Sequence, residues 1–137
     1  MNNLISDGIK FVYCLKGDKC VTVWKRTNGE FYIIFKRYES GAVPSDNYVQ
    51  ISNLNRDYVD VLFVNENKIL IAIDEKAYVV LKSSKGVIEL YMDHKVTNDS
   101  LYTYADGNYR LYRKEIDVIS INLEENYATD KAGKKLN

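Results

Sequence analysis

Short runs of β-branched, aromatic and aliphatic residues follow one another along almost the whole chain, and Gly, Asn, Asp and Ser separate them about every ten residues. Runs such as "FYIIFKR" and "YVDVLFV" are typical of strands. No stretch repeats apolar residues at spacings of three and four over a helical length. The sequence therefore predicts an all-β fold, an antiparallel meander of about nine or ten short strands in a small barrel or a two-layer sandwich, with little or no helix.

The length of 137 residues fits one domain, and a hydrophobic content of 46% with 28% charged residues is enough for a globular core. We expect a single all-β domain over residues 1–126. Residues 127–137 lack apolar periodicity, which predicts a flexible C-terminal tail.

Turn residues predict the register of three hairpins. Asn28-Gly29 suits a two-residue type I′ turn, which would place Val23 opposite Ile34. A two-residue turn at Glu66-Asn67 would place Leu62 opposite Ile71, and Asp60 opposite Ile73. In both hairpins the two faces carry apolar residues, so we expect these strands to be central or covered.

The third hairpin is the tyrosine-rich stretch "YTYADGNYRLYRK", residues 102–114. With Asp106-Gly107 as a type I′ turn, Tyr104 pairs with Tyr109 and Tyr102 with Leu111, so these four share one face, predicted to be core. The opposite face then carries a basic and aromatic group, which we take as a candidate partner-binding site: Arg110, Tyr112 and Lys114. Exposed strand aromatics beside cations can also stack single-stranded nucleic acid.

The longest irregular segment between strong strands runs from residue 39 to residue 48 and holds the only proline. Binding residues concentrate in loops that a rigid sheet holds in place. Asp46, Asn47 and Tyr48 follow the stiff proline and are a second candidate partner-binding group. The alternative is a plain connection in which Asn and Asp stabilise turns.

Two cysteines, Cys14 and Cys20, lie on consecutive predicted strands. A three-residue loop with Gly17 in the left-handed region would place them opposite one another and allow a cross-strand disulfide. A two-residue loop at Gly17-Asp18 would separate them. Because a reducing compartment keeps thiols free, we expect two buried free thiols.

Catalytic motifs are absent from the sequence: it has no nucleophile elbow, phosphate-binding loop or zinc-protease helix signature. The remaining enzymatic option is a carboxylate pair on the sheet, Asp60 with Glu89, where Glu89 would face Val80 in a hairpin. His94 is the only histidine and the only conventional general base. We expect no catalysis, no cofactor and no metal site.

The formal net charge is zero, whereas nucleic-acid-binding domains are usually basic, so the balance argues against a nucleic-acid partner. The N-terminus lacks an apolar leader, and no apolar run is long enough to span a membrane, which predicts a cytoplasmic protein without a membrane partner. Many of its commonest residues have AT-rich codons, as in low-GC bacteria and their phages.

These observations favour a small intracellular binding protein that contacts another protein or a second copy of itself. Twelve tyrosines support this expectation, because tyrosine is favoured in interfaces. An inhibitor or adaptor encoded by a phage or a bacterium would be one form of it. The alternative is a barrel that carries a small molecule, or a protein that binds single-stranded nucleic acid.

Overall fold

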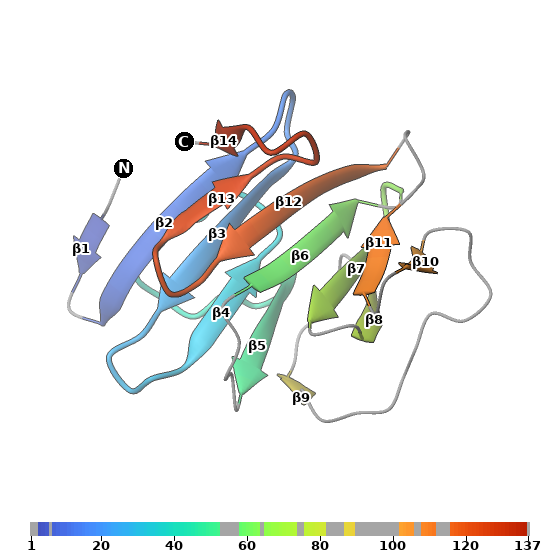
Figure 1. Ribbon diagram of the computed structural model, residues 1–137. Coiled ribbons are helices and arrows are strands. Elements are labelled where there is room, and N and C mark those ends of the chain that lie inside the picture. Colours follow the sequence, from blue (N-terminus) through green and yellow to red (C-terminus); the bar gives the residue numbers. More distant parts are fainter. Residues whose placement is uncertain are drawn as a thin grey trace.

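The computed structural model describes residues 3–5, 7–52, 58–63, 65–73, 76–81, 87–89, 102–105, 108–111 and 116–136, with side chains over 7–51, 58–63, 65–73 and 116–136. These residues contain strands and turns and no helix. The strands form two larger sheets and one separate hairpin (Figure 1). The all-β prediction is therefore confirmed.

The first sheet, sheet A, has the order β1-β2-β3-β4-β5-β9. Its strands are β1 (Asn3–Ile5), β2 (Gly8–Cys14), β3 (Cys20–Lys25), β4 (Phe31–Ile34), β5 (Tyr48–Ser52) and β9 (Val87–Glu89). Pairing is antiparallel from β1 to β5, and β9 runs parallel to β5. The N-terminal third of the chain thus folds as the meander that the sequence predicts.

The second sheet, sheet B, has the order β14-β13-β12-β6-β7-β8 and is antiparallel throughout. Its strands are β6 (Tyr58–Phe63), β7 (Lys68–Ile73), β8 (Lys76–Leu81), β12 (Asp117–Asn122), β13 (Tyr127–Thr129) and β14 (Lys135–Leu136). The separate hairpin is β10 (Tyr102–Ala105) with β11 (Asn108–Leu111). Sheet B joins the middle of the chain to its C-terminal end.

The two sheets pack face to face, and their inward-facing side chains fill the space between them. Along each strand the core residues recur at every second position, as the pleat requires. One buried cluster contains residues of both sheets: Tyr13, Val21, Val23, Ile33, Phe35, Val49 and Ile51 from the sheet A side, and Val59, Val61, Phe63, Ile69, Ile71, Ile73, Ile119, Ile121, Leu123 and Ala128 from the sheet B side. The described strands form a sandwich and not a closed barrel.

Two predicted registers are wrong by one residue. The loop after β3 has three residues, with Gly29 at φ +89°, and the amide of Arg26 donates to the Glu30 carbonyl (2.9 Å). This is the longer hairpin loop in which a glycine occupies the left-handed position that closes the turn. Val23 consequently pairs with Ile33, and both lie in the core.

The loop between β6 and β7 behaves similarly. The amide of Asn65 donates to the Lys68 carbonyl (3.3 Å), but the amides of Asn67 (2.8 Å) and Lys68 (2.9 Å) donate to Asn65 Oδ1. Farther along the strands the register is shifted by one residue, so that Leu62 pairs with Leu70, and Asp60 pairs with Ala72. A side-chain bond to the backbone competes here with the two-residue turn.

Residues 127–137 were predicted to be a flexible tail, but the described part of this segment, residues 127–136, adds two strands to sheet B. Asn126, at φ 61°, closes the turn that leads into β13, and Ala128 is fully buried against the core. Three-residue and two-residue strands are too short to show periodicity, so the sequence pattern does not reveal them.

The predicted hairpin from β8 to β9 is also wrong. β9 leaves sheet B and pairs in parallel with β5, so Glu89 lies opposite Ser52 and not opposite Val80. Alternating residues show that a segment is a strand but do not say which strand is its neighbour. The sandwich prediction survives, but the meander is interrupted at this point.

Candidate partner-binding surface

The predicted binding loop is held against the outer face of sheet A by its own residues. Asn47 has φ 58°, its carbonyl accepts the amide of Phe35 (2.8 Å), and its side-chain amide donates to Asp46 (3.0 Å). The Tyr48 ring stacks on Tyr32 with centroids 5.5 Å apart. Each of the three predicted residues thus has a structural contact, and their use in partner binding stays a prediction.

The outer face of sheet A is an aromatic cluster that encloses a lysine. Lys10 is 1% exposed, its Nζ lies 4.4 Å from the Trp24 ring centroid and 4.7 Å from the Tyr38 ring centroid, and it donates to the Ser40 carbonyl. Burial lowers the pKa of Lys10, while the charge of Glu39 opposes this shift. The Lys10 ammonium is therefore enclosed by the aromatic rings of its own sheet face and is not available to a ligand.

Arg26 closes the other side of this cluster. Its guanidinium pairs with Asp7 (2.6 Å) and Glu30 (3.1 Å) and lies over the Trp24 and Tyr32 rings. The hydrogen bond from Arg26, followed by those from the backbone and hydroxyl of Thr27, lowers the pKa of Asp7. The charged groups described here on the outer face of sheet A are therefore paired with one another or with the aromatic rings of the same face.

The β10–β11 hairpin has the register that the sequence predicts. Tyr104 pairs with Tyr109, and Thr103 pairs with Arg110. The side chain of Arg110, like Tyr112 and Lys114, lies outside the described residues, as does the candidate general base His94. The register is confirmed, and the partner-binding role of this group stays a prediction.

An open aromatic surface lies on sheet B instead. Tyr58 on β6 and Tyr127 on β13 flank Asn122 on β12 in one cross-strand row. Tyr58 is 53% exposed, its hydroxyl lies 3.3 Å from that of Tyr127, and Lys135 Nζ lies 4.8 Å from the Tyr127 ring centroid. We call Tyr58, Asn122, Tyr127 and Lys135 the tyrosine surface.

A buried residue between the two tyrosines holds the tyrosine surface in place. Asn122 is 3% exposed, and its Oδ1 accepts the amide of Glu125 (2.8 Å). The hydrogen bond between the two hydroxyls raises the pKa of Tyr58 and lowers that of Tyr127, and contacts with Asn122 lower both. Sequence reasoning missed this surface because Tyr127 lies in the predicted tail. The sequence signal that could have revealed this surface is the pair Asn126-Tyr127, which follows the last predicted strand.

The two carboxylates considered for catalysis lie on different sheets. Asp60 is on the outer face of sheet B, where it shares a face with Leu62 and Leu70, and Glu89 is on sheet A. Burial raises the pKa of Asp60, and a hydrogen bond with Ser120 opposes this shift. No described cation neutralises Asp60. The pairing that a retaining or inverting glycosidase requires is therefore not formed by these two residues.

Replacing Asp60 with asparagine is expected to raise the free energy of unfolding at pH 7 by about 1 kcal/mol, because a partly buried carboxylate without a cation is unfavourable. A raised folded-state pKa means that stability is lost as pH rises from the ordinary aspartate value through the folded value. Urea denaturation at pH 3.5 and pH 7 should show the gain of Asp60→Asn only at pH 7. The exposed Asp18→Asn is the control, and an equal gain in both variants contradicts the assignment.

A cleft of about 620 Å³ opens at the end of the sandwich, between the β2–β3 turn and the β13–β14 turn. Leu15, Val118, Ala132 and Leu136 provide its apolar lining, together with Cys14, Lys16, Asp117, Asp130, Lys131 and Lys134. Asp117 pairs with Lys19 (2.6 Å) and lies 3.9 Å from Lys131. Asp130 Oδ1 accepts the amides of Ala132 and Lys134, so this carboxylate shapes the turn.

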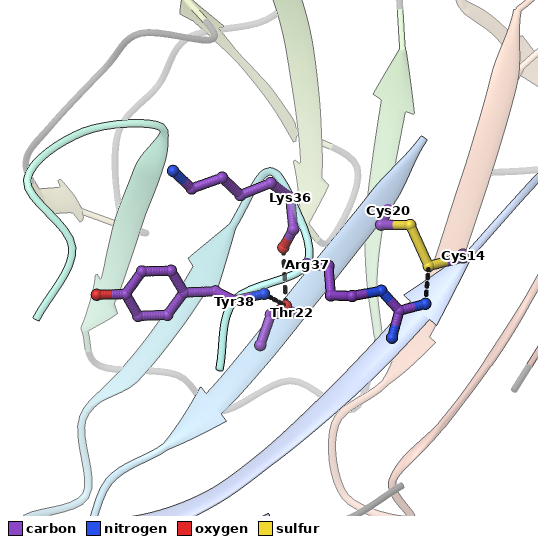
Figure 2. The surroundings of a disulfide bond; sticks show 6 residues. All are labelled: Cys14, Cys20, Thr22, Lys36, Arg37 and Tyr38. Carbon is purple, nitrogen blue, oxygen red and sulfur yellow. Dashed lines mark hydrogen bonds between the residues drawn. A yellow bond between two sulfur atoms is a disulfide. The ribbon is translucent and has the colours of Figure 1, made fainter. Parts of the chain in front are cut away.

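At the same end, Cys14 and Cys20 form a disulfide, so the expectation of two free thiols is wrong (Figure 2). The amide of Leu15 donates to the Lys19 carbonyl (2.8 Å), and Gly17 has φ +79° within a three-residue loop. The cysteines follow as a directly opposed pair. In an antiparallel sheet, side chains approach one another most closely at directly opposed pairs that exchange no backbone hydrogen bonds. This is the first of the two loop alternatives.

Comparison of the chain with protein-family models, with curated proteins and with solved structures gives no match. Among the described residues, no group of three or more His, Cys, Asp or Glu side chains could hold a metal ion. In the same part of the chain, no helix has the length and apolar character needed to cross a membrane. Function must therefore be inferred from surface chemistry.

Proposed function

We propose that the protein acts by binding another protein, or a second copy of itself, through the tyrosine surface, and that it works in the cytoplasm without catalysing a reaction. The observation that carries the proposal is the exposure of Tyr58 beside Tyr127 on the outer face of sheet B. Tyrosine combines a large apolar ring with a polar tip and loses little side-chain entropy when it is bound. Two neighbouring rings supply the kind of anchor that dominates interface energetics.

The arrangement is preorganised, which favours binding. The hydroxyl contact and the underlying Asn122 fix both rings before a partner arrives, and Lys135 adds one cation at the rim. A preorganised surface avoids part of the ordering cost of association. The other aromatic cluster, around Trp24, is not available to a partner because its own lysine and arginine occupy it.

The packing argues against the barrel carrier. Side chains from both sheets fill the interior of the described sandwich, so no lumen separates them. The nucleic-acid alternative depends on Arg110, Tyr112 and Lys114, and the neutral net charge of the chain disfavours it.

Site-specific photocrosslinking tests the proposal. A photoreactive phenylalanine analogue at Tyr58 should give a discrete adduct in the cells that naturally produce the chain. The same analogue at Val43, which is 44% exposed in the loop on the other sheet, should not. Adding Tyr127→Ala to the Tyr58 probe should reduce the adduct about tenfold, as for loss of an interface anchor. Sedimentation of the purified chain tells whether the adduct is a self-association.

Two outcomes would overturn the proposal. Equal adducts from positions 58 and 43 would mean non-specific proximity. An adduct at position 58 that Tyr127→Ala leaves unchanged would mean that the tyrosine surface is not the anchor. Circular dichroism of each variant confirms that the sheets are retained.

A further inference from the structure

The disulfide lies beside a cation that the fold holds in place. Arg37 Nη2 is 3.4 Å from Cys14 Sγ. Figure 2 shows the Arg37 side chain reaching over Cys14, whereas the Lys36 side chain points away from the sulfur atoms. Cys14 is partly exposed and Cys20 is 8% exposed, so the two sulfur-bearing residues differ in access.

A buried hydroxyl fixes the backbone that carries Arg37. Thr22 is fully buried; its Oγ1 donates to the Lys36 carbonyl (2.8 Å) and accepts the amide of Tyr38 (3.0 Å). These two bonds bracket Arg37 and tie residues 36–38 to β3 (Figure 2). A purely structural disulfide would not require a positioned guanidinium at one of its sulfur atoms.

Further positive charge lies in the turn between the cysteines, which holds Lys16 and Lys19 together with Asp18. Lys19 is engaged by Asp117, but Lys16 is exposed and makes no ion pair with any described residue. Cations next to a cysteine stabilise its thiolate, and thiolates are the reactive species in thiol–disulfide exchange.

We propose that the Cys14–Cys20 disulfide is a thiol–disulfide exchange site for a low-molecular-weight anionic thiol of the glutathione class, with Cys14 as the attacked sulfur and Arg37 as the group that stabilises its thiolate. This site is separate from the tyrosine surface and rests on the proposed function only for the location in the cytoplasm. In such a reducing compartment, disulfides are usually catalytic or redox-sensing.

The exchange proceeds in two balanced steps. The external thiolate attacks Cys14 Sγ, a new sulfur–sulfur bond forms, and the electron pair of the broken bond leaves on Cys20 Sγ, which takes a proton from water. A second external thiolate attacks the external sulfur of this mixed disulfide. The electron pair then leaves on Cys14, where Arg37 faces the thiolate. Two external thiols are oxidised to their disulfide, and the protein disulfide gains two electrons.

The first test follows reduction of the whole chain by glutathione at pH 7, with the adduct mapped by mass spectrometry. We expect the mixed disulfide on Cys14 and a reduction rate about three to ten times lower in Arg37→Gln. Lys36→Gln is the matched control, since it removes the neighbouring charge that points away from the sulfur atoms, and it should change the rate less than twofold.

The charge of the attacking thiol gives a second readout that a structural role of Arg37 would not alter. After correction for thiolate content, the reduction rate should be highest for mercaptopropionate, lower for mercaptoethanol and lowest for cysteamine. Arg37→Gln should reduce the differences among these three rates. In urea, where the fold is lost, the variants should react alike. An adduct on Cys20, or equal rates for Arg37→Gln and Lys36→Gln, would overturn the proposal.

Discussion

Replacing Gly8 with alanine is expected to destabilise the protein by at least about 3 kcal/mol. Gly8 begins β2 at φ +96°, and a Cβ atom on it would lie 1.9 Å from the Lys25 carbonyl oxygen and 2.8 Å from the Arg26 Cα. Both are backbone atoms of the neighbouring β3 segment and cannot rotate away. The strands must separate, which also strains the contacts of Asp7 with Trp24 and Arg26.

Other glycines separate the two causes of this effect. Gly29 has φ +89° but open space around it, so Gly29→Ala should cost about 1 kcal/mol, the strain of the left-handed conformation alone. Gly41 has open space and no such conformation, so Gly41→Ala should change stability by less than about 0.5 kcal/mol. Urea denaturation measures all three. A Gly8→Ala loss equal to that of Gly29→Ala would refute the close approach of β2 and β3.

The fold class could be predicted because alternation of side chains is a local property. Each strand reports its own period, and the tyrosine hairpin also reports its register, since Asp106-Gly107 separates two regular strands. Asn28-Gly29 carries a similar signal but gives a longer loop, because Asn28 Oδ1 accepts the amide of Glu30 and Gly29 takes the closing position. Turn sequence alone does not choose between these outcomes.

Non-local features could not be predicted. The pairing of β9 with β5 depends on which edge is open once the sheets have packed, and β13 and β14 are too short for their period to show. Because Tyr127 belongs to sheet B only through β13, the tyrosine surface cannot be predicted from the periodicity of the separate strands. The expectation of free thiols is wrong, and the two loop geometries, of which one allows the disulfide, differ by a single residue of loop length.

Raising the pH from 10 to 12 is expected to reduce the free energy of unfolding through one buried tyrosine. Tyr13 is 5% exposed in the core cluster, and burial raises its pKa from 10.0 to about 12. Below pH 10 the hydroxyl is protonated in both states, so the contribution to stability is fully present. Above pH 10 the unfolded chain ionises first, and stability falls until the folded pKa is passed. The loss amounts to about 2–3 kcal/mol.

The variant Tyr13→Phe isolates this term from the other tyrosines. It keeps the ring and removes the ionisable hydroxyl, which makes no hydrogen bond with any described residue, so its stability at pH 7 should lie within about 1 kcal/mol of the wild type. From pH 10 to pH 12 it should lose about 2–3 kcal/mol less than the wild type. Tyr48→Phe, a partly exposed control, should fall with the wild type. Parallel curves for Tyr13→Phe and the wild type would mean that the Tyr13 hydroxyl reaches water, and that the β2 side of the sandwich core is open at this point.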